Sequence, residues 1–235
     1  MTSAALIKER FYGGREHPYR TFERLIAESV GPETVLLDAG CGRHAETVRR
    51  FAPMVKTAIG VDLVEFPQAD SSAVHLAKND LCALALRDAS VDVVVARSVL
   101  EHLDDPGRAW AEVSRVLKPG GRFIFLTPQL WDYGSVFARL IPNRFHPALV
   151  NKVEGRAEAD TFPVRYRCNT VGAVRRLAGR HGFRLEAVRH LNQYPCYLMF
   201  SPALFLLGTA YERITSRWEA LRALRGWLLV SLKKA

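Results

Sequence analysis

The sequence contains few cysteines, and no two of them stand at metal-binding or redox spacing. Its 235 residues include four cysteines and no C-x-x-C motif. This pattern disfavours a disulfide framework or a zinc site and is typical of reduced thiols in a cytoplasm. The first residues lead directly into the charged segment Lys8–Arg10, without the apolar stretch of a signal peptide. We therefore expect a cytoplasmic protein. The separated cysteines are Cys41, Cys82, Cys168 and Cys196.

Repeats, low-complexity segments and long apolar runs are also absent from the sequence. Residues 191–211 carry no charge, but this stretch is interrupted by polar residues, prolines and Gly208, which argues against a membrane-spanning helix. An apolar content of 49% is sufficient for a sizeable core. At this length, one α/β domain with an elaboration is more plausible than two independent domains.

The net charge of +9 is unevenly distributed along the chain. Residues 1–128 hold 16 basic and 17 acidic side chains, so 17 basic and 7 acidic ones remain for residues 129–235. Such asymmetry indicates either contact with nucleic acid or an anionic membrane, or arginines on solvated helices. Both interpretations stay open at this point.

Apolar runs bounded by glycine or acidic residues alternate with amphipathic segments through the first part of the chain. This alternation predicts a doubly wound, mostly parallel α/β sheet. The later part predicts a helical C-terminal insertion followed by a last strand. We expect strands at 34–38, 57–61, 74–77, 91–96, 122–127, 183–188 and 226–233. We expect helices at 17–30, 44–51, 106–117, 170–179 and 203–224. The segment Lys118–Gly121 should end the helix at 106–117.

The most informative motif is Asp38-x-Gly40-x-Gly42, at the end of the first predicted strand. The glycines allow a sharp turn and a close approach of the backbone to a ligand. The N-terminal amides of the following helix face the same space. Asp38 would repel the diphosphate of a dinucleotide, whereas it would attract an ammonium or a sulfonium. This favours S-adenosylmethionine over NAD, and the oxidoreductase alternative is further disfavoured because the third glycine of a dinucleotide-binding turn is missing.

Two further acidic residues follow the next predicted strands. Asp62 lies 20 residues after Gly42, a distance suited to an acceptor of both ribose hydroxyls. Asp80 and Leu81 follow the third strand, where a carboxylate can accept from an adenine amino group and a backbone amide can donate to the ring. Leu63 is placed to pack against the adenine face.

Residues 34–128 resemble the class I S-adenosylmethionine-dependent methyltransferases. The resemblance rests on four signals in the family's order: the glycine turn, Asn79–Leu81, the segment Ser90–Leu103, and Glu112–Gly121 with its Lys-Pro-Gly-Gly element. It implies S-adenosylmethionine as cofactor, a Rossmann-like fold and cofactor contacts at Asp38, Gly40, Cys41, Gly42, Asp62, Leu63, Asp80 and Leu81. Arg97 is expected to reach the methionine carboxylate or an anionic substrate.

Within this resemblance, His102 is the candidate general base, because it follows the fourth strand. The alternative is a histidine that packs or bonds to the backbone. Glu101-His102 suggests a magnesium site of the Glu-x-x-Glu-His type, but Ser98 occupies the first position of that pattern. We therefore predict no metal. An Asn-Pro-Pro-Tyr motif for methylation of base amino groups is also absent.

We expect a small-molecule acceptor, with a lipid- or glycan-linked precursor as one class. An RNA methyltransferase is the alternative, favoured only by the basic second half. The expected organisation is a single domain, with residues 1–30 as a helical lid, 31–128 as the cofactor-binding core, and 129–235 as substrate-side loops, C-terminal helix and last strands. Tyr12, in the possible lid segment 10–14, and Tyr166 and Arg167 are the candidate substrate contacts.

The predicted helix at 203–224 carries an apolar stripe at alternating three- and four-residue steps. We expect the sheet or a second subunit to cover this stripe, so that the protein is a monomer or a homodimer. Peripheral contact with the inner face of a membrane is the alternative, supported by basic neighbours and a tryptophan. The stripe consists of Leu204, Leu207, Tyr211, Ile214, Trp218 and Leu221.

Overall fold

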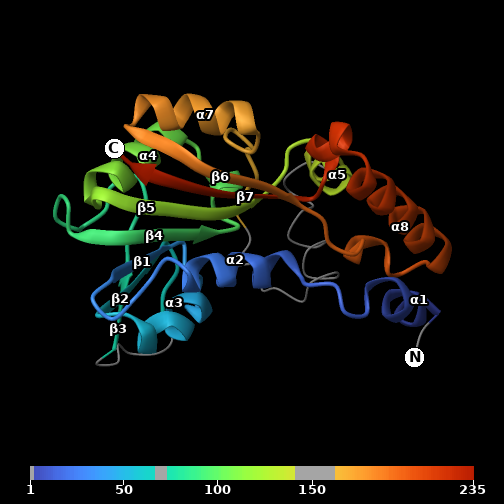
Figure 1. Ribbon diagram of the computed structural model, residues 1–235, viewed down its shortest axis with the longest axis horizontal. Coiled ribbons are helices and arrows are strands. Elements are labelled where there is room, and N and C mark those ends of the chain that lie inside the picture. Colours follow the sequence, from blue (N-terminus) through green and yellow to red (C-terminus); the bar gives the residue numbers. More distant parts are fainter. Residues whose placement is uncertain (1–2, 67–72, 141–161) are drawn as a thin grey trace.

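The computed structural model describes residues 3–66, 73–140 and 162–235, which form a seven-stranded sheet, helices on both of its faces and a separate helical group (Figure 1). The strand order is β3-β2-β1-β4-β5-β7-β6. All neighbours pair in parallel except β7, which is antiparallel to both β5 and β6. The expected doubly wound, mostly parallel sheet is therefore confirmed. The strands are β1 (Val35–Ala39), β2 (Thr57–Asp62), β3 (Val74–Lys78), β4 (Val91–Arg97), β5 (Leu117–Pro128), β6 (Phe183–Leu191) and β7 (Trp227–Lys234).

Four helices cover the sheet. On one face lie α2 (Pro18–Ala27) and α3 (Glu46–Phe51), and on the other lie α4 (Pro106–Val116) and α7 (Val171–Arg180) (Figure 1). Because both faces are buried, the central strands are apolar almost throughout, as parallel strands usually are.

The larger core is built around Trp110 of α4. Its ring packs edge-on against Phe123 at 5.5 Å, Phe125 at 5.8 Å and Phe183 at 5.9 Å between ring centroids. These aromatic contacts join β5 and β6 to the helix layer. The contacts therefore extend from β5 to β6, the edge strand of the sheet.

The Lys-Pro-Gly-Gly element ends α4 where expected, but it belongs to β5 rather than to a separate turn. The pairing of β4 with β5 is irregular between Val91 and Val93, and Gly120 has a positive φ of 77°. Lys118 donates to both oxygens of Asp92 at 2.8 and 2.9 Å. The element is thus a bulge in the strand, fixed by glycine conformation and an ion pair.

A second group of helices lies beyond the carboxyl end of β5 and is called the cap lobe here (Figure 1). Within it, α1 packs on α8 through Tyr12, whose ring meets those of Tyr194 and Phe205 edge-on at 6.1 and 6.2 Å. None of the helices in the described parts of the chain is long and apolar enough to cross a membrane. The cap lobe consists of α1 (Ser3–Tyr12), α5 (Tyr133–Leu140), the 3-10 turns η5 (Cys196–Leu198) and η6 (Glu219–Leu224), and α8 (Pro202–Arg217).

The helix expected at 203–224 is divided at Trp218, which adopts an extended conformation with ψ of 113°. The Arg225 guanidinium donates to the carbonyl oxygens of Thr215 and Ser216 at 2.9 and 3.4 Å. A side chain thereby satisfies the open carbonyls at the end of α8, so the helix can stop there. The turn η6 then leads into β7.

Of the two covers expected for the apolar stripe of this helix, the sheet is wrong, and a second subunit stays a prediction. Leu207 is 67% exposed and Trp218 is 61% exposed. The buried face of α8 is instead Phe205, Gly208, Thr209, Glu212 and Thr215. A side chain at Gly208 would lie 2.7 Å from Pro195, so the lack of a side chain lets the η5 segment pack closely on this face.

Candidate functional site

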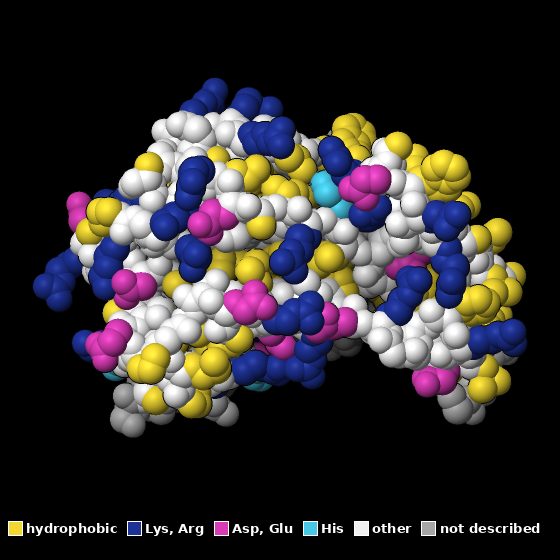
Figure 2. Space-filling model, viewed as in Figure 1, with side chains coloured by type: hydrophobic (Ala, Val, Ile, Leu, Met, Phe, Trp, Pro, Cys, Tyr) yellow, Lys and Arg dark blue, Asp and Glu magenta, His cyan; other side chains and the backbone are white. Residues whose placement is uncertain are grey.

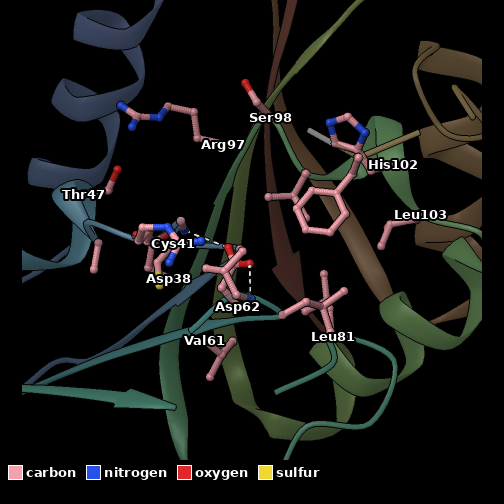
Figure 3. A pocket seen from close by; sticks show the side chains of 18 of the residues that line it. Asp38, Cys41, Thr47, Val61, Asp62, Leu81, Arg97, Ser98, His102 and Leu103 are labelled. Atoms are coloured by element: carbon pink, nitrogen blue, oxygen red, sulfur yellow. Dashed lines mark hydrogen bonds between the residues drawn. The ribbon is translucent and has the colours of Figure 1, made fainter. Parts of the chain in front are cut away.

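A cavity of about 870 Å³ opens at the carboxyl ends of β1, β2 and β4. In an open parallel sheet this edge is the usual place for a ligand. Figure 3 shows Asp38, Asp62 and Leu81 along one side of the cavity, with Arg97, Ser98 and His102 on the other. All the predicted cofactor contacts lie among its lining residues.

The glycine turn between β1 and α3 forms the floor of the cavity. Gly40 and Gly42 have positive φ angles of 80° and 70°. A Cβ on Gly40 would lie 2.2 Å from Val99, whereas one on Gly42 would meet nothing within 4 Å. Gly40 is thus required for close packing, and Gly42 faces open space where a ligand can approach the backbone.

Asp38 is buried at 2% exposure and accepts a hydrogen bond from the Val48 amide in the first turn of α3, at 3.2 Å. Burial raises the pKa of Asp38 to about 7, while the nearby Arg97 and this hydrogen bond act in the opposite direction. A carboxyl group in this position would be held ionised by a bound cation. This is the electrostatic property that the sequence led us to expect.

Asp62 stands at the end of β2, beside the glycine turn. One oxygen accepts from the Gly42 amide at 2.7 Å and the other accepts from the Val64 amide at 3.2 Å. These two bonds fix the carboxylate, and each oxygen keeps a lone pair for a further donor. The arrangement fits a pair of vicinal hydroxyls.

The side of the cavity near β3 combines apolar and polar groups. Leu63 is 52% exposed and Leu81 is 8% exposed. Asp80 accepts from the Cys82 amide at 2.8 Å, which fixes its carboxylate at the edge of the cavity. Two leucines and a carboxylate can accommodate a flat heteroaromatic ring with an amino group.

Arg97 lies on the wall between α2 and α3. Its guanidinium is 4.6 Å from the centre of the Tyr19 ring and 3.7 Å from Glu46. Tyr19 and Glu46 both line the cavity and were not identified from the sequence. Tyr19 belongs to a helix far from the glycine motif in the chain, and no spacing pattern points to it.

Ser98, the residue after Arg97, has a positive φ of 57° and a buried hydroxyl without a hydrogen-bond partner among the described residues. A strained backbone and an orphaned polar atom commonly occur together at ligand sites. Ser98 lines the cavity together with His102, the predicted base, and it has these two features of a ligand-contacting residue.

His102 ends the turn η2 (Leu100–His102) and lines the cavity, as expected. Its Nδ1 is 3.1 Å from the carbonyl oxygen of Pro163. A carbonyl only accepts, so Nδ1 carries the proton and the lone pair is on Nε2. Nε2 lies 3.9 Å from a carboxylate oxygen of Glu101, which is itself buried and accepts from the Thr127 hydroxyl at 3.0 Å.

Residues 162–169 form a strap that is fastened over η2. The backbone amides of Arg165 and Tyr166 both donate to the Glu101 carbonyl, at 2.6 and 3.0 Å. The Cys168 thiol and the Asn169 amide bond to Leu100 and to β5. The strap thus closes one end of the cavity.

The strap places neither of its two predicted substrate residues at the cavity. Phe162, Pro163 and Arg165 line it, but Tyr166 and Arg167 do not. Arg167 donates to the Asp104 carbonyl, and Tyr166 adopts a positive φ of 52°. The prediction of Tyr166 and Arg167 as lining residues is therefore wrong, and Arg165 is the arginine of this segment that faces the cavity.

Tyr12 lies in the cap lobe and does not line this cavity. It is buried between α1 and α8, beside Glu212, and burial raises its pKa. The segment 10–14 therefore does not fold over the cofactor side as a lid in this structure. The N-terminal element that does reach the cavity is α2, through Tyr19.

Comparisons with known proteins agree with this geometry. Residues 37–125 match the family model described as a methyltransferase domain. A probable S-adenosylmethionine-dependent methyltransferase of Mycolicibacterium smegmatis is 35% identical over 63% of this chain and 57% of its own length. A malonyl-[acyl-carrier protein] O-methyltransferase of Pseudescherichia vulneris is 32% identical over 66% of this chain and 67% of its own. The chain belongs to the class I S-adenosylmethionine-dependent methyltransferases.

A solved structure of an S-adenosylmethionine-dependent methyltransferase from Mesorhizobium loti shares the fold of this methyltransferase, with a TM-score of 0.58 and 21% identity over 90% of this chain and 95% of that one. The matched region spans little more than half of the Mycolicibacterium relative. The dinucleotide-dependent oxidoreductase alternative is set aside by this family membership.

The residues present fit the cofactor of the family. Asp62 would hold the ribose, Leu63, Asp80 and Leu81 the adenine, and Asp38 the cationic amino-acid part. Gly42 has no side chain and faces open space, so a ligand can approach its backbone closely. Among the described residues, no group of three or more His, Cys, Asp or Glu side chains is placed to hold a metal ion.

Proposed function

We propose that this methyltransferase methylates a small-molecule acceptor that binds between His102 and the strap, with His102 as general base. The observation that carries the proposal is the fixed tautomer of His102, whose Nδ1 is held 3.1 Å from the Pro163 carbonyl. A histidine in this state offers Nε2 to a proton on the acceptor.

When bound, S-adenosylmethionine supplies an electrophilic methyl group. The chain aligns the acceptor and excludes water, which is the main requirement of an in-line displacement. Phe162 and Pro163 cover the end of the cavity where His102 lies. His102 Nε2 accepts the proton that an acceptor hydroxyl or amino group loses, and the buried Glu101 carboxylate at 3.9 Å stabilises the resulting imidazolium.

The acceptor class that fits this end of the cavity is a small anionic or polar group carried on a larger precursor, such as a lipid- or glycan-linked one. Arg165 lies at the cavity and its guanidinium is 2.6 Å from Asp104. An anionic acceptor could exchange with Asp104 for this cation. One relative is named for O-methylation of a carrier-bound malonyl group, which supports an oxygen acceptor.

The excess of basic residues in 129–235 favours RNA as a second candidate acceptor. A gel-shift assay with mixed RNA at increasing salt distinguishes the two. Tight binding that weakens steeply with salt would favour RNA, and no shift is expected for a small-molecule enzyme.

The deciding experiment is incubation of a cell extract with labelled S-adenosylmethionine and the protein, followed by mass spectrometry of the methylated product. With that acceptor, His102→Gln is expected to lower kcat by roughly 10²–10⁴-fold and to leave the affinity for S-adenosylhomocysteine unchanged. His75→Gln, an exposed histidine on β3, is the matched control.

An unchanged kcat in His102→Gln would overturn the role of the base but not the methyl transfer. We also expect turnover to survive EDTA, because Ser98 stands where a magnesium site of the Glu-x-x-Glu-His type needs a carboxylate. Activity lost with EDTA and restored by magnesium would show that other ligands complete a metal site.

A further inference from the structure

The outer surface of the cap lobe exposes large apolar side chains from three elements. Phe200 is 77% exposed, Leu207 on α8 is 67%, Phe137 on α5 is 61% and Leu6 on α1 is 57%. Trp218, at the end of α8, is 61% exposed. Single exposed apolar residues are ordinary, but several on one lobe indicate a surface that is covered by something else.

This arrangement follows from how α8 is buried. Its inward face carries Gly208, Thr209, Glu212 and Thr215, and the two threonine hydroxyls donate to carbonyl oxygens of the helix at 2.8 and 3.1 Å. The Asn192 amide also donates to the Glu212 carbonyl and to the Thr215 hydroxyl at 3.2 and 3.0 Å. Apart from Phe205, the large apolar residues of the helix are left on the outside or only half-buried as a result.

Basic side chains lie between the exposed apolar ones, as the outer edge of the cap lobe in Figure 2 shows. Lys8 lies 4.0 Å from the centre of the Tyr194 ring, and Arg213 lies 5.1 Å from that of Phe11. Within the described part of the chain, neither of them nor Arg217 has a carboxylate in ion-pair distance. Aromatic faces hold two of these cations without neutralising them.

The acidic side chains of the same region do not balance this charge. Glu212 is buried at 2% exposure, and Glu219 is paired with Arg225 at 2.7 Å and with Arg222 at 3.6 Å. Glu9 on α1 is the exposed carboxylate that remains in the described helices of the lobe. The surface is therefore apolar with a net positive charge.

Charge complementarity distinguishes between the occupants of such a surface. A symmetric dimer through this face would bring the same arginines of two copies together, because the patch must pair with itself. Anionic lipid headgroups provide the opposite charge, and the acyl boundary beneath them accepts the apolar side chains. A tryptophan such as Trp218, close to these cations, is typical of the interface between the lipid headgroups and the acyl chains.

We propose that the outer surface of the cap lobe, comprising Leu6, Phe137, Phe200, Leu207, Arg213 and Trp218 together with Arg217, binds the surface of an anionic lipid bilayer. The protein lies on the membrane rather than crossing it. This inference does not depend on which acceptor is methylated.

The test is co-sedimentation of the full chain with vesicles of phosphatidylcholine alone and of phosphatidylcholine with about one third phosphatidylglycerol. Binding is expected only to the second and is expected to fall with salt. Arg213→Gln with Arg217→Gln should weaken it by roughly 30-fold, about fivefold for each cation near the surface. Phe200→Ser with Leu207→Ser should weaken it by roughly tenfold or more at any salt concentration.

Two variants on the other side of the molecule are the matched controls. Arg175→Gln with Arg176→Gln removes two exposed arginines of α7, and Met54→Ser removes a side chain that is 44% exposed beyond α3. Both should bind vesicles as the unaltered chain does. Affinity for S-adenosylhomocysteine, measured by calorimetry, shows that every variant is folded.

Failure of the unaltered chain to bind anionic vesicles would overturn the proposal, as would equal binding to neutral ones. Equal weakening of vesicle binding by the α7 variant would also overturn it, because the attraction would then come from the overall positive charge of the protein and not from the cap lobe. A dimer in sedimentation velocity that dissociates in Phe200→Ser with Leu207→Ser, without vesicle binding, would assign the surface to a second copy instead.

Discussion

The carboxylate of Asp62 and the backbone amide of Gly42 are joined by a hydrogen bond of 2.7 Å across the floor of the cofactor cavity. This bond links the end of β2 to the glycine turn that follows β1. It holds the carboxylate in place before any ligand arrives, so little side-chain entropy is lost when a ligand binds. The pair is a preformed element of the site, so its removal should mainly lower the affinity for the ligand.

Asp62→Ala is expected to weaken binding of S-adenosylhomocysteine by about 2 kcal/mol or more, because a charged acceptor of hydroxyl hydrogen bonds is lost. Titration calorimetry measures the change, and NAD should show no comparable affinity for the unaltered chain. Glu65→Gln, a neighbouring exposed carboxylate paired with Lys78, is the control and should bind normally. An unchanged dissociation constant in folded Asp62→Ala would refute the ribose assignment.

The affinity for S-adenosylhomocysteine is expected to rise between about pH 6 and pH 8. Burial raises the pKa of Asp38 to about 7, so the group is largely protonated below this pH and ionised above it. The ionised form attracts the ammonium of the ligand. Methylthioadenosine lacks the amino-acid part and should bind with little pH dependence over the same range. Equal pH profiles for the two ligands would remove Asp38 from this role.

Glu212 should make the free protein less stable as the pH rises. Burial raises its pKa to about 7 from an ordinary value of 4.5, so the folded chain holds this proton more tightly than the unfolded chain does. Stability contributed by the protonated form is present below pH 4.5 and is lost as the pH rises to about 7. The loss is on the order of 3 kcal/mol at most, and the pKa of about 7 already includes the opposing effect of Arg15 at 3.8 Å.

Glu212→Gln removes this titration, so its stability relative to the unaltered chain should be higher at pH 8 than at pH 5. Urea unfolding at both values provides the comparison. Glu219→Gln is the control, because Glu219 is exposed and its pKa is lowered by Arg225. A constant difference between Glu212→Gln and the unaltered chain at both pH values would contradict the prediction.

Gly40→Ala is expected to destabilise the fold by about 3 kcal/mol or more. The new Cβ would lie 2.2 Å from Val99, and alanine is strained at a φ of 80°. Gly172→Ala on α7 places its Cβ in open space within a helix and should be neutral or slightly stabilising. Thermal unfolding of both variants tests the pair, and equal melting temperatures would show that the turn can relax.

The positions of the strands and the cofactor end of the site could be predicted from the sequence because their signals are local. Asp38, Gly40 and Gly42 lie within one turn, Asp62 directly follows an apolar run, and Asp80 comes shortly after the next predicted strand. In a parallel sheet, neighbouring carboxyl ends meet at one edge. The side chains at those ends therefore had to converge.

The acceptor end could not be predicted in the same way. Tyr19 reaches the cavity because α2 packs across the sheet, and Arg165 rather than Arg167 faces it because two strap amides are fastened to the Glu101 carbonyl. Both depend on tertiary contacts between distant segments. The buried face of α8 was also misjudged, since Gly208, Thr209 and Glu212 are buried by partners that no hydrophobic periodicity reveals.

The place of β7 between β5 and β6 has a consequence for how the protein folds as it leaves the ribosome. β6 is synthesised before β7 and, among the strands that the structure describes, pairs with β7 alone, so the earlier strand has no neighbour in that sheet until the later one emerges. The cofactor-binding half, β1 to β5, can pair beforehand from contacts closer in sequence. During that interval, both β5 and β6 expose unpaired strand edges, which are the segments most open to chaperones or to misassembly.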